Sequence, residues 1–305
     1  MSGGGEVVVE RREVEYFLAI AEHGSFTGAA KSLRVAQPSL STAIGQLENR
    51  LGGKLFHRLP HGVRLTAAGE ALLEPARQVM RDLSTAQDSV RQVLGLASGR
   101  LDIVAQTTLA VDPLARLIGE FLRHYPQVDV RVFDQELGKT ATGSVRAGQC
   151  ELGVVDASTD PEGMAEAVLP GRQIYAVLPP GEPGQKRIGL SELAARDFVA
   201  TPEGTATRAV IEDVVAASGL RAKVSVETAH LAMVVPLVLA GAGVTLLPES
   251  MAVGAAKEGA TVLPLRPKVV RSSRLLWRPG PLSPAASRFV DLATSSARPR
   301  EKRVR

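Results

Sequence analysis

The sequence has little of what stabilises extracellular or membrane proteins. Cys150 is the only cysteine among 305 residues, so no intrachain disulfide can form and a reducing compartment is the natural setting. The longest apolar run, Leu231 to Leu247, is broken by Pro236 and by glycines, which favours a buried helix and a strand over a membrane span. The N-terminal MSGGGEVVVERREVEYF has acids on both sides of its short apolar run, unlike a signal peptide. We therefore expect a cytoplasmic protein.

Motifs of the common enzyme classes are also absent. The chain has neither a GxSxG nucleophile elbow nor a phosphate loop of the Walker type, and Gly241-Ala242-Gly243 lacks the third glycine of a dinucleotide fingerprint. The five histidines are scattered, and the neighbours His57 and His61 lack the further ligands that a zinc site needs. We predict no catalytic residues, no metal site and no cofactor.

The chain does contain a stretch, Ser25 to Arg50, with the pattern of two short helices joined by a tight turn. Ser25 or Thr27 can cap the first helix, whose apolar residues lie three and four apart on one face: Phe26, Ala29, Ala30 and Leu33. The second helix starts at Gln37-Pro38-Ser39, where a proline fits the first turn. Its predicted inward stripe is Leu40, Ile44, Leu47 and Leu51, and its outward positions are Gln37, Ser39, Thr42, Ala43 and Gln46. This pattern is typical of a helix-turn-helix whose second helix enters the DNA major groove.

Residues Tyr16 to Gly69 closely resemble the N-terminal domain of LysR-type transcriptional regulators. The matching segments are GSFTxAA, VxQPSLS, IxxLExxLGxxLF and RLTxAG, which together are far more specific than one short motif. The resemblance continues more weakly to about Leu292. It departs in the second helix, where family members often carry arginine and this chain has Thr42 and Gly45.

Basic residues and a predicted wing accompany the two helices. Leu55-Phe56 begins a short strand, Pro60-His61-Gly62 supplies a turn, and Val63 to Leu65 returns. Gln37, Ser39 and Thr42, beside Pro38, are the predicted base-edge or groove contacts. The predicted phosphate contacts are Ser25, Thr27, Lys31, Arg34, Lys54, Arg58 and Arg64. A solvated surface is the alternative interpretation of such a charge cluster.

A long helix is predicted from Thr66, its cap, to about Leu96. Two interleaved heptad series form the a and d positions of a coiled coil, namely Leu72, Val79, Ala86 and Val93, and Ala76, Leu83, Val90 and Ala97. This pattern predicts dimerisation through the helix, and the alternative is packing against its own domain. Pro75 interrupts the helix, and Ala97 to Arg100 is interpreted as a hinge.

From Leu101 the pattern changes to strands alternating with helices, which predicts parallel-sheet units. Strands are expected at 101–105, 128–133, 151–155, 174–178, 198–200, 224–226, 244–247, 261–265 and 269–277. Helices are expected at 112–124, 140–147, 207–218, 230–240 and 284–293. The fold class is α/β overall, and the resemblance implies a two-lobed effector domain similar to periplasmic binding proteins. The predicted domains are a winged helix-turn-helix (1–66), a linker helix and hinge (67–99), an effector domain (100–297) and a basic tail (298–305). Lobe I spans 100–165 and 266–297, and lobe II spans 166–265.

The resemblance implies that three segments line an effector pocket. They contain Gln106, Thr107 and Thr108 after the first strand, Thr201, Thr205 and Thr207 before a helix, and His230 at another helix start. Strand carboxyl ends are where ligands bind in open α/β sheets, and helix N-termini favour anions, so a carboxylate effector is expected. The alternatives are that the threonines are ordinary caps and that His230 is a surface or capping histidine. Cys150 is predicted to be a buried core thiol and not a redox switch.

Together these features predict a ligand-responsive transcription factor. As a dimer or tetramer it would bind a pseudo-palindromic double-stranded DNA operator and a small anionic effector, with RNA polymerase as a further partner. Two alternatives are an architectural or constitutive DNA-binding protein without a ligand, and a cytoplasmic solute-binding receptor.

Overall fold

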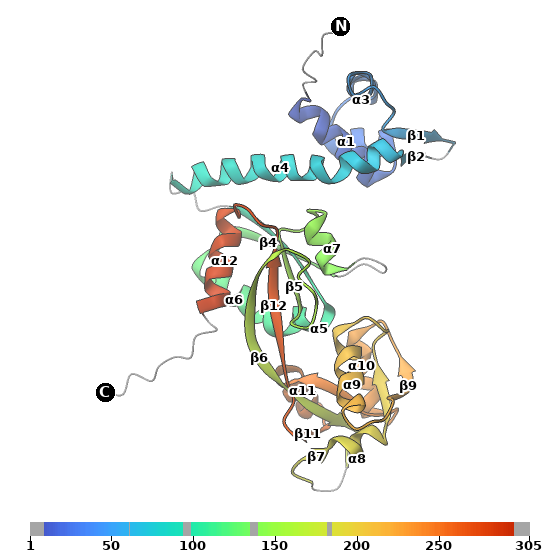
Figure 1. Cartoon of the computed structure of the whole chain (residues 1–305), viewed down its shortest axis with the longest axis vertical. Helices are drawn as coiled ribbons and strands as arrows, with labels where there is room; N and C mark the ends of the chain where they lie inside the picture. Colours follow the sequence, from blue (N-terminus) through green and yellow to red (C-terminus); the bar gives the residue numbers. More distant parts are fainter. Residues whose placement is uncertain (1–8, 61, 94–98, 135–139, 182–184, 296–305) are drawn as a thin grey trace. The chain divides into compact units, whose positions relative to one another are not determined.

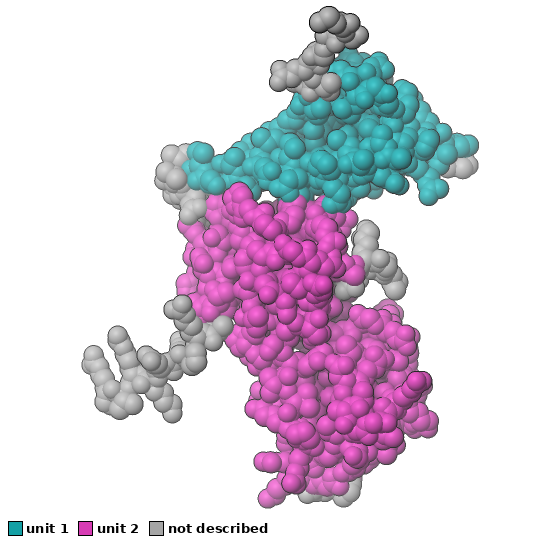
Figure 2. All heavy atoms as spheres, viewed as in Figure 1, with its two compact units in different colours: residues 1–94 teal, residues 95–305 magenta. Residues whose placement is uncertain are grey.

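The computed structural model describes residues 9–60, 62–93, 99–134, 140–181 and 185–295. The chain divides into two compact units, Met1–Leu94 and Gly95–Arg305 (Figure 2). Residues 1–8 and the basic tail predicted at 298–305 lie outside the described residues. No helix within the described ranges is long and apolar enough to cross a membrane.

Unit 1 is a three-helix domain with a β-hairpin wing and a long final helix (Figure 1). Its helices are α1 (Arg11–His23), α2 (Phe26–Leu33), α3 (Gln37–Leu51) and α4 (Ala67–Val93), and its strands are β1 (Phe56–Leu59) and β2 (Gly62–Leu65). Phe17, Ile20, Leu40, Ile44 and Leu47 are buried together at its centre. The helix-turn-helix and the wing are therefore confirmed.

The turn between α1 and α2 joins the wing to the helices. Gly24 adopts a left-handed φ of 62°, and its carbonyl accepts the Val63 N–H at 2.9 Å. Ser25 Oγ accepts the Gly28 N–H at 3.0 Å, so it caps α2. One predicted core residue is wrong: Leu51 is 40% exposed, because Leu55 and Phe56 fill the core beside the end of α3.

Helix α4 is capped by Thr66, whose Oγ accepts the Gly69 N–H at 3.1 Å. In its first half Leu72, Ala76 and Met80 pack against the unit 1 core, as the alternative interpretation expected. By contrast, Val79, Leu83 and Val90 are 46%, 38% and 61% exposed. Residues 94–98, which include most of the predicted helix end and hinge, lie outside the described residues. Gly99 and Arg100 belong to a strand and not to a hinge.

Unit 2 begins with β3 (Gly99–Ala105), α5 (Thr107–Leu109), η1 (Ala110–Leu114), α6 (Ala115–His124), β4 (Val128–Asp134), α7 (Ala141–Arg146) and β5 (Leu152–Asp156). The helix predicted from Asp112 starts instead at Thr107. Asp112, with φ −145° and ψ 116°, interrupts it, because a residue before proline is disfavoured in the α region.

The chain continues through β6 (Ala165–Leu178), β7 (Ile188–Gly189), α8 (Leu190–Ala194), β8 (Asp197–Ala200), α9 (Ala206–Ala216) and β9 (Lys223–Glu227). It ends with α10 (Leu231–Leu239), β10 (Thr245–Pro248), α11 (Glu249–Lys257), β11 (Thr261–Arg266), β12 (Val270–Trp277) and α12 (Pro284–Ser295). Sequence patterns missed α8, α11, β7 and the first half of β6.

The main sheet has the strand order β4-β3-β5-β12-β6-β11-β7, with β10 also paired to β6. Strands β3, β4 and β5 are parallel to one another, but β12 and β6 pair antiparallel with their neighbours. The sheet is thus mixed: the predicted parallel units occur at β3, β4 and β5, whereas the pairs of β12 and β6 are antiparallel. Strands β6 and β12 run side by side (Figure 1), and β6 continues into the second lobe, where it pairs with β10 and β11.

Each lobe has cores of its own. In the first lobe, Leu101 and Ile103 of β3 face α6 and α12, whereas Val104 faces the α7 side with Cys150. Cys150 is buried, as predicted, and this burial, with a smaller contribution from Asp102, raises the pKa of its thiol to about 12. The second lobe packs α8 and α9 on one set of buried residues and α10 and α11 on another.

Candidate DNA-binding surface and ligand pocket

Helix α3 presents a polar surface opposite its buried stripe. Gln37, Pro38, Ser39 and Thr42 are exposed, whereas Leu40 is fully buried. Its N-cap residue, Ala36, offers no side-chain acceptor, so the first N–H groups of α3 have no side-chain cap. The helix therefore offers polar side chains and an uncapped N-terminus, both suited to a nucleic acid.

Helix α2 contributes exposed polar and basic groups. Thr27 and Lys31 are exposed on the helix, and Arg34 follows it at a left-handed φ of 55°. Ser25 is half-buried and uses its hydroxyl oxygen as the α2 cap. With described residues, Lys31 and Arg34 form no ion pair with a carboxylate, so their charges are available to an anionic partner.

Two other basic residues are paired with buried carboxylates. Arg50 binds Glu13, and Lys54 Nζ donates to Glu48 Oε2 at 2.7 Å. Glu48 also accepts the buried Leu55 N–H at 2.9 Å. Burial raises the pKa of Glu48, but the hydrogen bonds from Lys54 and Leu55 and the charge of Lys54 outweigh it, so the pKa is lowered overall. The Glu48 carboxylate therefore links the end of α3 to the residues that precede the wing strand β1.

The two wing arginines lie on opposite faces of the hairpin. His57 pairs with Arg64 and Arg58 with Val63 in the antiparallel register, and directly paired residues share a face. Arg58 Nη2 donates to Ser41 Oγ at 3.0 Å, and its Cζ lies 4.8 Å from the centroid of the Phe26 ring. Arg58 is thus held against the helix-turn-helix, which the sequence pattern did not indicate, whereas Arg64 is exposed on the other face.

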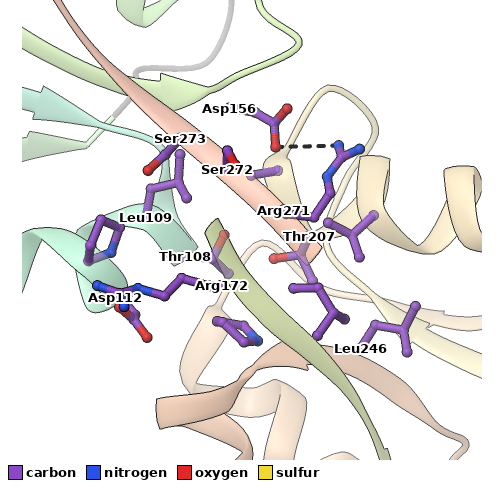
Figure 3. A pocket seen from close by; sticks show the side chains of 15 residues that line it. Thr108, Leu109, Asp112, Asp156, Arg172, Thr207, Leu246, Arg271, Ser272 and Ser273 are labelled. Atoms are coloured by element: carbon purple, nitrogen blue, oxygen red, sulfur yellow. Dashed lines mark ion pairs between the residues drawn. The ribbon is translucent and has the colours of Figure 1, made fainter. Parts of the chain in front are cut away.

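Unit 2 contains a pocket between its two lobes, at the crossing strands β6 and β12 (Figure 3). The cavity measures about 40 Å³, room for only about three water-sized spheres. Its polar lining comes from both lobes and both strands: Thr108, Asp112, Asp156, Arg172, Thr207, Arg271, Ser272 and Ser273. Its apolar lining includes Leu109, Ile174, Val210 and Leu246.

Two arginine–aspartate pairs line this pocket. Arg172 Nε lies 3.2 Å from Asp112 Oδ1, and Arg271 Nη2 lies 3.3 Å from Asp156 Oδ2. Arg271 Nη1 also donates to Asp213 at 2.7 Å. Sequence patterns missed all of these residues, because Arg172 and Arg271 are far apart in sequence and only strand pairing brings them together.

Of the seven predicted effector residues, the pocket includes Thr108 and Thr207, both buried. Gln106 Oε1 accepts the Asp156 N–H at 3.1 Å, and Thr107 Oγ1 donates to Asp134 at 3.4 Å. Thr205 caps α9, and its hydroxyl lies 2.5 Å from that of Thr201. His230 is exposed at the start of α10, outside this pocket. The part of the chain that the structure describes holds no group of three His, Cys, Asp or Glu side chains placed to bind a metal ion.

The fold and the two sites define a class: a winged helix-turn-helix protein with a two-lobed α/β domain that has a pocket between its lobes. Residues 11–70 match the bacterial regulatory helix-turn-helix protein, lysR family, and residues 94–298 match the LysR substrate binding domain. The chain belongs to the LysR family. It is a DNA-binding transcriptional regulator and not an enzyme.

Proteins of similar sequence and structure match this chain over nearly its whole length. A hydrogen peroxide-inducible genes activator of Pectobacterium carotovorum subsp. carotovorum is 28% identical, over 92% of this chain and 94% of its own. The transcriptional dual regulator GltC of Bacillus subtilis (strain 168) is 30% identical, over 93% of this chain and 96% of its own. Among solved structures, a full-length OxyR variant from Pseudomonas aeruginosa has a TM-score of 0.73 at 24% identity, covering 95% of both chains. Full-length CbnR complexed with its target DNA has a TM-score of 0.68 at 24% identity, covering 95% of this chain and 100% of that chain.

Proposed function

We propose that the protein binds a pseudo-palindromic DNA operator as a dimer or a dimer of dimers, and that a small anionic effector in the pocket between the lobes controls this binding. The observation that carries the DNA-binding half is the polar surface of α3 beside the buried Leu40, Ile44 and Leu47. Two such helices related by a two-fold axis would read half-sites about one helical turn, or a multiple of it, apart.

Base reading is assigned to Gln37, Ser39 and Thr42. A glutamine can bind adenine through two hydrogen bonds, and hydroxyls adapt to several bases. Because α3 carries no arginine among these positions, we propose that phosphate contacts from Lys31, Arg34 and Arg64, together with DNA shape, supply much of the affinity.

The experiment is a binding titration with an operator duplex and an unrelated duplex over a range of salt. Gln37→Ala is expected to reduce the specific-to-nonspecific difference by about 1 to 3 kcal/mol. Arg34→Ala or Arg64→Ala is expected to weaken binding to both duplexes and to flatten the salt dependence. Lys257→Ala, which removes an exposed cation from unit 2, is the matched control. An unchanged preference in Gln37→Ala, or an effect of the arginine variants on one duplex alone, would contradict these assignments.

Self-association is assigned to the exposed apolar residues of α4. Val79, Leu83 and Val90 recur at coiled-coil spacing and are exposed on the helix. Leu83→Glu is expected to shift the sedimentation coefficient towards the monomer and to weaken operator binding. An unchanged sedimentation coefficient would place the dimer contact elsewhere.

The anionic class of the effector is supported by the arginines in the pocket. Arg172 and Arg271 both line it, beside the hydroxyls of Thr108 and Thr207. An effector that touches residues of both lobes would change lobe closure and, through it, the spacing of the DNA-binding pairs. Calorimetric titration in which only neutral or cationic compounds bind would refute the anionic class.

A further inference from the structure

We infer that the effector carries two acidic groups, one for Arg172 and one for Arg271, joined by a short and largely apolar chain. This inference rests on the proposed function, because it specifies the ligand of the same pocket. The predicted ligand class is therefore an aliphatic dicarboxylate of few carbons.

The strand register brings the two arginines together. Arg172 of β6 lies directly opposite Arg271 of β12 in the antiparallel pairing, next to a shift in register. Directly opposite residues share a face of the sheet, and two like charges in such a pair destabilise it. The two side chains extend in different directions from this point, Arg172 towards Asp112 and Arg271 towards Asp156 (Figure 3). The pocket consequently has two separate ends, each with one arginine beside one aspartate.

Both arginines have unused hydrogen-bond donors. Nε and Nη2 of Arg172 are buried without a hydrogen-bond partner among the described residues, and so are Nε and Nη2 of Arg271. Each guanidinium has a nearby aspartate, but at 3.2 and 3.3 Å neither contact has the geometry of a hydrogen bond. A buried donor without an acceptor is costly, and a carboxylate supplies two acceptor oxygens in the arrangement that an arginine fork matches.

Hydrogen bonds with described residues occupy one oxygen of each aspartate. Asp112 Oδ2 accepts the Ser250 hydroxyl at 2.6 Å. Asp156 Oδ1 accepts the Ser158 N–H at 2.9 Å and its hydroxyl at 2.6 Å. The other two oxygens, Asp112 Oδ1 and Asp156 Oδ2, lie near the arginines without accepting a hydrogen bond from them, so a ligand carboxylate at each end would supply the acceptors that the arginine donors lack.

The pocket lining also includes apolar side chains and hydroxyls. Ile174, Val210 and Leu246 form part of the apolar lining, and Thr108 and Thr207 supply hydroxyls from opposite lobes. Methylene groups between the two carboxylates would bury apolar surface here. Because the cavity is only about 40 Å³, such a ligand enters when the lobes separate and then bridges them.

The test is calorimetry on the full-length chain with malonate, succinate and glutarate. The comparison ligands are monomethyl succinate, which has one charge, and succinamide, which has none. One dicarboxylate is expected to bind about 10- to 100-fold more tightly than its half-ester, as expected for charged hydrogen bonds at a second end. In Arg172→Gln and in Arg271→Gln, this ratio is expected to fall towards one. Arg221→Gln, an exposed arginine on the second lobe, serves as the control and should keep the ratio.

Arg172→Lys keeps a positive charge beside Asp112 but removes the forked donors, so it covers the case in which Arg172→Gln does not fold. Equal affinity for diacid and half-ester, an unchanged ratio in the arginine variants, or no binding of any diacid would each overturn the inference. Operator binding is measured on the same samples. A chain that binds its operator but no diacid refutes only the ligand class, whereas a chain that binds no DNA refutes the proposed function.

Discussion

Replacing Glu48 with alanine tests how the recognition helix is joined to the wing. The Glu48 carboxylate accepts the buried Leu55 N–H at 2.9 Å and the Lys54 ammonium at 2.7 Å. Loss of the acceptor leaves a buried N–H unpaired, which costs about 1 to 3 kcal/mol. Lys54 is 71% exposed, so the ion pair itself contributes at most about 1 kcal/mol. Glu48→Ala is therefore expected to destabilise unit 1 by about 1 to 4 kcal/mol, and Lys54→Ala by less than about 1 kcal/mol.

Urea denaturation can separate this effect from the rest of the chain. The only tryptophan, Trp277, lies on β12 of unit 2, so its fluorescence reports that unit, whereas circular dichroism reports both. Glu48→Ala should shift the part of the dichroism transition that belongs to unit 1 and leave the tryptophan transition in place. Glu48→Gln keeps an acceptor, so the stability of its unit 1 should lie between those of the two other variants. If Glu48→Ala lowered the free energy of unfolding no more than Lys54→Ala does, the hydrogen bond to Leu55 would not be the main contribution of Glu48 to stability.

Three further outcomes follow from contacts in unit 1. Because folding lowers the pKa of Glu48, the stabilisation that this carboxylate provides is present above its ordinary pKa of 4.5 and is lost as the pH falls through the folded pKa. Glu48→Gln should therefore flatten the acid side of the curve of unit 1 stability against pH. An unchanged curve would contradict this. Ser25→Ala removes the α2 cap and should cost about 1 kcal/mol in unit 1 melting experiments, with Ser39→Ala on the exposed surface of α3 as the neutral comparison. A Cβ at Gly69 would lie 2.2 Å from the Leu55 carbonyl oxygen, whereas a Cβ at Gly45 meets nothing within 4 Å. Gly69→Ala should therefore destabilise unit 1 by about 1 to 3 kcal/mol, and Gly45→Ala should stabilise it by about 0.5 to 1 kcal/mol. Stability changes of the same sign in both variants would refute the steric argument.

The helix-turn-helix could be predicted from sequence because its signals are local. The spacing of Leu40, Ile44 and Leu47 places them on one face, and turn residues mark the wing. The first half of β6 could not be predicted, since Pro170 and Gly171 resemble a turn. In the structure Gly171 lies in the strand, where Val270 Cγ1 comes within 2.5 Å of the position that a Cβ would occupy. Pairing with β12 therefore overrides local propensity.

The pocket depends on the same pairing. Thr108 and Thr207 could be proposed because each follows a strand or opens a helix. Arg172 and Arg271 could not, because their positions depend on a strand register that local sequence does not encode. Ser25, in contrast, caps α2 in the structure. The sequence allowed this role as well as a phosphate contact.

The crossing strands give unit 2 the organisation of one domain inserted into another. Gln173 pairs with Val270, and the Ile174 N–H donates to the Val269 carbonyl at 3.0 Å, so the chain leaves the first lobe and returns to it at neighbouring positions. Each lobe also has a core of its own. Residues 174–269 could consequently be excised and replaced by a two-residue turn, which would leave β6 and β12 as an ordinary hairpin. The second lobe is thus, in topological terms, a very long hairpin loop that folds on its own core.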